Sequence, residues 1–94
     1  MSTINVSGKL LNAGACHVEL SLIQYKKDTI AKEYTAGFED SFQVDPGICS
    51  IVIDGLTNGD LEFTISGDDV VSVDPPTPIL YHQTIHGSLD ITTK

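Results

Sequence analysis

Oxygen-bearing side chains in the turns of this sequence could bind a metal ion. Acidic and amide residues gather in two short stretches, as Asp54, Asn58, Asp60, Asp68, Asp69 and Asp74. Carboxylate and amide oxygens on loops suit Ca²⁺, which takes about six to eight such ligands. Neither stretch matches an EF-hand loop, and Asp and Asn are also ordinary residues of tight turns. Two interpretations remain, a calcium site and simple turn chemistry, and the second is favoured.

The three histidines are the next candidates, as general bases or metal ligands. His82 and His86 are four residues apart, which in a strand places them on one face at a separation of about 13 Å. That separation is too large for both to bind one metal ion. His17 falls on the expected solvent face of its strand. We therefore expect surface or structural roles for these side chains.

No arrangement of nucleophilic residues is evident. Cys16 and Cys49 stand among apolar neighbours, where burial raises the pKa of a thiol and makes it a poor nucleophile. No Gly-x-Ser-x-Gly elbow is present. We expect no enzyme, with a small hydrolase as the remote alternative. The cysteines are expected to be free thiols, and a bond between two strands is the other interpretation.

Three tyrosines offer a contact surface. Tyr25, Tyr34 and Tyr81 combine a large ring with a polar tip, which suits sugar stacking or protein contact. Their positions in three separate segments are also typical of residues at the rim of a core. Both interpretations stay open, and rim positions are favoured.

The charge balance excludes several classes of partner. Thirteen acidic residues face five lysines and no arginine, which gives a formal net charge of −8. Binding to nucleic acid or to an anionic membrane surface depends on Lys and Arg, so neither is expected. No apolar stretch is long enough to insert into a membrane. Because no secretory leader precedes the first strand-like residues, a cytoplasmic location is favoured, although a removed signal would leave the same sequence.

Short runs with a period of two predict the elements that position these residues. Apolar and polar residues alternate in runs separated by Gly, Pro, Asn and Asp, and apart from a weak run through residues 25–36 no helical period competes with them. Asp45-Pro46-Gly47 predicts a turn, Asp54-Gly55 the end of a strand covered on both faces (48–53), and Asn58-Gly59 a tight hairpin. The expected strands cover residues 4–10, 16–22, 30–35, 38–44, 48–53, 61–65 and 70–73, with a last one from Ile79 to Ile91. We therefore predict one all-β domain over residues 1–94, a seven- to eight-stranded antiparallel β-sandwich.

Residues 4–68 resemble the prealbumin-like domains, a group that includes carboxypeptidase regulatory-like and transthyretin-like modules. Val6-Ser7-Gly8, followed by the strand that begins at Ala15-Cys16, resembles the first two strands of that family. Phe42-Gln43-Val44-Asp45-Pro46-Gly47 resembles its Phe-x-x-x-Pro-Gly element. Cys49 stands where the family usually has Tyr. The resemblance implies an immunoglobulin-like or prealbumin-like sandwich, a mostly non-catalytic accessory role, and no catalytic residue.

Two functions follow as expectations. The first is a recognition module whose loops or sheet face bind a protein, peptide or carbohydrate. The second is a structural subunit, a homo-oligomer in which the strand from Ile79 to Ile91 pairs with a neighbouring copy. Asp74-Pro75-Pro76-Thr77-Pro78 precedes that strand, and such a stiff linker allows it to dock on its own sheet or on another.

Overall fold

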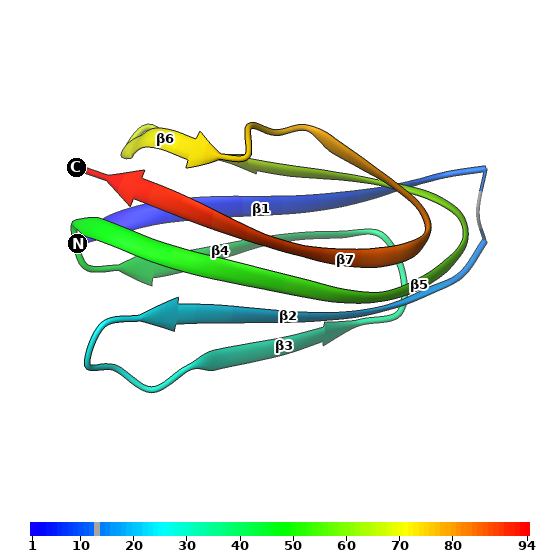
Figure 1. Ribbon diagram of the computed structural model, residues 1–94, viewed down its shortest axis with the longest axis horizontal. Helices are drawn as coiled ribbons and strands as arrows, with labels where there is room; N and C mark the ends of the chain where they lie inside the picture. Colours follow the sequence, from blue (N-terminus) through cyan, green and yellow to red (C-terminus); the bar gives the residue numbers. More distant parts are fainter. Residues whose placement is uncertain (13) are drawn as a thin grey trace.

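A computed structural model describes residues 1–12 and 14–94. Every element in this part of the chain is a strand, and all pairings are antiparallel (Figure 1). The strands are β1 (Ser2–Leu11), β2 (Cys16–Gln24), β3 (Ile30–Tyr34), β4 (Phe38–Val44), β5 (Gly47–Ser66), β6 (Val70–Asp74) and β7 (Ile79–Thr93). The prediction of an all-β antiparallel chain is confirmed. A sandwich of immunoglobulin or prealbumin type stays a prediction.

The 20-residue strand β5 organises the sheet. One of its edges pairs with β7 along almost its whole length. Its other edge pairs first with β2 and then with β1, so these two strands follow one another along the same side. The outer strands β3 and β4 pair with β2 and β1, and β6 pairs with the end of β7. All seven strands therefore belong to one sheet.

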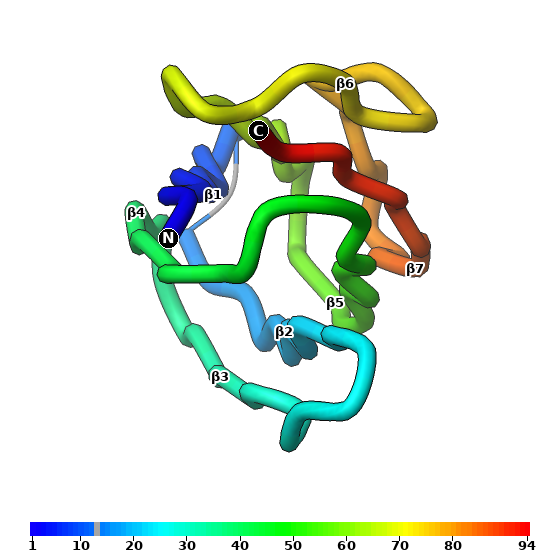
Figure 2. Tube along the Cα trace, turned by 90° about the vertical axis from the view of Figure 1, so that its left-hand side faces the viewer, coloured from blue at the N-terminus to red at the C-terminus, as the bar shows by residue number. Residues whose placement is uncertain are grey.

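The sheet curls because its long strands bend at one level. The register of β5 on β7 shifts between Leu56 and Asp60. On the other edge of β5, β1 ends at Leu11 opposite Asp60, and β2 begins at Cys16 opposite Thr57. Asn58 ties these pieces together, since its Oδ1 accepts hydrogen bonds from the N–H groups of Gly14 and Ala15 at 3.1 and 3.3 Å. Figure 1 shows β5 and β7 curving at this end, and Figure 2 shows the strands arranged around a common interior.

Three sequence predictions around β5 need correction. The Asn58-Gly59 hairpin and the strand end at Asp54-Gly55 are wrong, because β5 runs unbroken through both. Instead of forming a two-residue turn, Asn58 lies in the bend of β5, and its side chain accepts hydrogen bonds from Gly14 and Ala15. Residues 48–53 are not covered on both faces, because Ile48 is 73% exposed while Ile51 is buried. The turn predicted at Asp45-Pro46-Gly47 is confirmed, since it joins β4 to β5.

Alternate residues of the strands form the core, as a period of two requires. Each of the long strands contributes, and the partly buried rings of Tyr34 and Tyr81 pack against the same cluster. The side chains with the least exposure and largest volume are Phe63, Ile4, Leu20, Leu22, Ile51, Ile53, Leu61, Ile85, Leu89 and Ile91. The opposite set of side chains points outward and carries the candidate binding groups.

Candidate binding surface

A row of carboxylates crosses the outer side of the sheet on adjacent strands. Glu33 of β3 stands opposite Glu19 of β2, and Glu19 stands opposite Asp54 of β5. The row ends on β7, where His86 stands opposite Asp54 and its Nδ1 lies 2.5 Å from the Asp54 Oδ1. Directly opposed residues have Cβ atoms about 4.5–5.5 Å apart, so these acidic groups are immediate neighbours.

His17 lies beside the same row. Its Nε2 is 3.6 Å from Oε1 of Glu19 and 3.5 Å from Oε1 of Glu33. Lysine does not neutralise these acids: within residues 1–12 and 14–94, the only lysine in an ion pair is Lys27, at 2.9 Å from Asp45. Like charges directly opposed in a sheet destabilise it, so the arrangement opposes folding.

An exposed leucine lies next to the histidine. Leu56 is 65% exposed and stands opposite His17 on one side and Thr84 on the other. A small depression here is lined by Ala15, Cys16, His17, Leu56, Thr57 and Asn58. We call the surface formed by Glu19, Glu33, Asp54, His17, His86 and Leu56 the acidic face. It offers negative charge across three strands with an apolar contact at one end.

The residues considered for calcium do not converge. Asp54 contacts His86, Asp60 contacts His82, and Asn58 binds the β1–β2 connection. On the other stretch, the Asp69 Oδ2 accepts a hydrogen bond from the Thr3 N–H at 2.9 Å.

Asp68 lies in the turn before β6, and Asp74 at the end of β6 stands opposite Asp90. Among the described residues, no group of three or more His, Cys, Asp or Glu side chains could hold a metal ion. Asp54, Asp60 and Asp69 instead make the local contacts given above.

The tyrosines occupy three different places. Tyr25 is 85% exposed in the turn after β2. Tyr34 stands opposite Val18 near the start of β2, where its ring stacks on Phe38 with centroids 4.0 Å apart. Tyr81 belongs to the first part of β7 and its hydroxyl lies over Gly87. Tyr34 and Tyr81 are rim-of-core residues, and the arrangement offers little support for a shared stacking platform.

The hydroxyl of Tyr34 donates a hydrogen bond of 2.7 Å to the Asp40 Oδ2. This bond and a second one, from the Ser41 N–H, hold the pKa of the Asp40 carboxyl below its ordinary value. Burial, the same hydrogen bond and the charge of Asp40 raise the pKa of the Tyr34 hydroxyl well above its usual range. The pair links β3 to β4 across the open side of the sheet.

We expect Tyr34→Phe to lower the free energy of unfolding by about 1 kcal/mol at pH 7, since a partly exposed hydrogen bond to a carboxylate is lost. A lowered carboxyl pKa stabilises the fold above the ordinary pKa, about 4, and this contribution is lost as pH falls through the lowered value. Urea unfolding from pH 7 to pH 2 should show the two proteins converging in acid. A difference that stays constant with pH would contradict the assignment.

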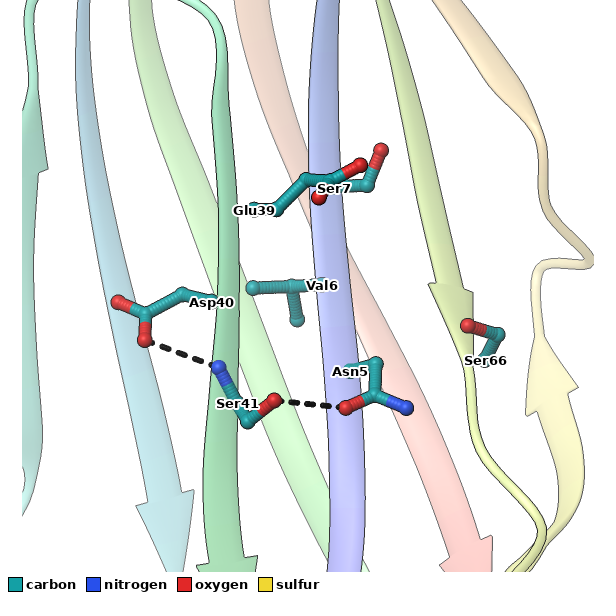
Figure 3. Close-up of a pocket in the computed structure, with 7 residues that line it drawn as sticks. All are labelled: Asn5, Val6, Ser7, Glu39, Asp40, Ser41 and Ser66. Carbon is teal, nitrogen blue, oxygen red and sulfur yellow. Dashed lines mark hydrogen bonds between the residues drawn. The ribbon is translucent and has the colours of Figure 1, made fainter.

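A second polar surface lies on the other part of the sheet, over β1 and β4. Figure 3 shows a depression lined by Asn5, Val6, Ser7, Glu39, Asp40, Ser41 and Ser66. The Ser41 hydroxyl donates to Oδ1 of Asn5 at 2.7 Å, and the Ser41 N–H donates to Asp40 (Figure 3). Part of its hydrogen-bonding capacity is thus used internally, and no aromatic ring lines it.

Both cysteines are free. Cys16 stands opposite Thr57 and Cys49 opposite Gln24, at the two ends of the β2–β5 ladder, which places them too far apart for a disulfide. Burial raises the pKa of both thiols, so neither is activated as a nucleophile.

The sequence pattern does not single out Glu19 and Glu33 as binding residues. The alternation of β2 does place Glu19 outward, and the same signal is available for Glu33 in β3. What the pattern lacks is the order of strands, which brings Glu33, Glu19 and Asp54 into one row.

Comparison with protein-family models, with curated proteins and with solved structures found no match. In the described residues, no helix is long and apolar enough to cross a membrane.

Proposed function

We propose that this protein is a non-enzymatic recognition module that binds a basic segment of another protein through the acidic face. The row of Glu33, Glu19 and Asp54 on adjacent strands is the observation that carries this proposal. Its members repel one another and have no lysine partner among the described residues. A cationic partner would relieve that repulsion, so the row is better explained by binding than by stability.

A protein partner is favoured over a carbohydrate. Charged and apolar groups occur together on the acidic face, where Leu56 is exposed beside His17. Sugar binding would be better served by clustered aromatic rings, whereas Tyr25, Tyr34 and Tyr81 lie apart. The resemblance to prealbumin-like domains supports an accessory module, and with it we propose that the curled sheet is a sandwich of that type.

A second candidate function is self-assembly through the edge of β7. It is supported by the pairing of β7, because residues 79–82 and 84–89 pair with β5 alone while Asp90 and the residues after it also pair with β6. The net charge of −8 opposes close association of identical chains, which makes this the weaker candidate.

The test of the recognition proposal is Glu19→Gln, which removes the central charge of the row. We expect the free energy of unfolding to rise by about 0.5 kcal/mol at low salt, because two repulsions are relieved, and the gain to shrink with added salt. Binding of a lysine-rich peptide should weaken by up to about fivefold, as expected for one exposed charge pair. Urea unfolding and isothermal titration calorimetry measure the two effects.

Glu62→Gln is the matched control. It makes the same change of charge on β5, but Glu62 stands opposite Lys9 on the other part of the sheet. Equal losses of peptide affinity in both variants would mean that only net charge matters and would reject the acidic face as the binding surface.

A further inference from the structure

Strand β7 has an unpaired edge next to the acidic face. Residues 84–89 pair with β5, but β6 reaches β7 only from Asp90 onward. Pro75 follows the last residue of β6, Asp74, which stands opposite Asp90. Within residues 1–12 and 14–94, no strand pairs with the free edge of residues 84–89. Beyond the end of β6, the unpaired edge of β7 is therefore about six residues long.

This edge lacks the features that keep other edges from pairing. Natural edge strands commonly carry charged residues or proline that discourage further strands. The outer strand β3 carries Lys32 and Glu33, and β4 carries Glu39 and Asp40. Residues 84–89 contain no lysine, acid or proline. Their backbone groups are available to an added strand.

The residues around this edge determine which side chains an added strand should have. On the inner side, the Tyr81 hydroxyl lies over Gly87. Val73, near the end of β6, is half-buried against the core, so apolar side chains would also fit on the inner side of an added strand. On the outer side, His86 ends the acidic row at Asp54, so basic side chains would fit. In a strand these two requirements alternate, because successive side chains point to opposite faces.

Two further acids favour basic side chains on the outer side of an added strand. Asp74 and Asp90 stand directly opposite one another where β6 ends. Asp90 accepts a hydrogen bond of 2.7 Å from the Ser50 hydroxyl. An added strand on residues 84–89 would thus lie next to His86, with Asp54 one strand further away and with Asp74 and Asp90 beyond its end. That charge is complementary to lysine or arginine.

We propose that an extended segment of a partner protein, with basic and apolar residues alternating, adds to the sheet along residues 84–89. Addition of a strand supplies backbone hydrogen bonds for affinity, and the alternating side chains supply specificity. The basic character of the segment rests on the proposed function, while strand addition rests on the open edge. A second copy of this chain is a poorer occupant, because each copy has a net charge of −8.

The experiment uses the 94-residue chain and an eight-residue peptide with capped ends in which lysine and valine alternate. Amide hydrogen exchange and chemical shifts are followed by NMR. In the free protein, the amides of residues 84–89 that face away from β5 should exchange quickly. The peptide should slow their exchange at least tenfold. The control is the same peptide with its central backbone amides N-methylated, which keeps the charges but cannot pair as a strand, and it should give no protection.

The outcomes separate the two proposals. Shifts confined to β2 and β3, with equal binding of the N-methylated peptide, would overturn strand addition and leave the acidic face intact as a binding surface. Protection of residues 84–89 that is unchanged by Glu19→Gln and by salt would support strand addition but contradict the acidic-face proposal. Protection that develops without peptide, with doubled mass, would identify a second copy as the occupant and overturn the inference. Absence of binding would overturn both.

Discussion

Gly55→Ala is expected to lower the free energy of unfolding by about 3 kcal/mol or more, because the substitution both strains the backbone and separates two central strands. Gly55 has φ +154°, a backbone conformation that residues other than glycine rarely adopt. A Cβ at this position would overlap the carbonyl oxygen of His17 in β2. The strands can therefore pair closely here only if residue 55 lacks a side chain.

Gly14→Ala is the control for this prediction. A Cβ built on Gly14 meets no atom within 4 Å, so its substitution should change the free energy of unfolding by less than about 1 kcal/mol. Both variants are compared by urea unfolding followed by circular dichroism. Similar midpoints for Gly55→Ala and the native protein would show that β2 and β5 do not approach as described.

Phe63→Ala is expected to lower the free energy of unfolding by about 3–5 kcal/mol, the usual penalty for removing a buried aromatic ring. Phe63 is fully buried in β5, and its ring centroid lies 6.4 Å from that of Phe38. Phe38 in turn fills the space over Gly8 and stacks on Tyr34. Removal of the Phe63 ring would leave a cavity beside this aromatic group, which joins β5 to the outer strands.

Phe63→Leu tests whether lost volume or lost aromatic contact accounts for the decrease in the free energy of unfolding. It keeps most of the apolar volume, so we expect a smaller loss, about 1–2 kcal/mol. The free energies of unfolding of both variants are measured at equilibrium in urea. If Phe63→Ala cost less than Phe63→Leu, Phe63 would not be the closely packed centre described above.

Several features of the fold could be predicted from local patterns. The alternation in residues 16–22 predicts β2 with its buried set, Val18, Leu20 and Leu22. Asp45-Pro46-Gly47 predicts the β4–β5 turn, because proline and glycine determine the backbone conformation locally. Such features depend on residues close in sequence, which is why they are predictable.

The errors occur where distant contacts overrule local preference. Asn58-Gly59 is a strong hairpin signal, yet Asn58 binds the backbone of the β1–β2 connection and β5 continues past it. The hydrophobic run at residues 48–53 predicts cover on both faces, but Ile48 is largely exposed. Neither result can be read from neighbours in the sequence.

By itself, the sequence determined the all-β class, the outward or inward direction of most strand residues, and the strongly acidic charge. Only the tertiary structure decided the strand order, which assembles Glu33, Glu19 and Asp54 into one row and, among the residues that the structure describes, leaves one edge of β7 unpaired. The physical reason is that alternation depends on the two-residue period within a strand, whereas strand order depends on pairings between segments far apart in the chain.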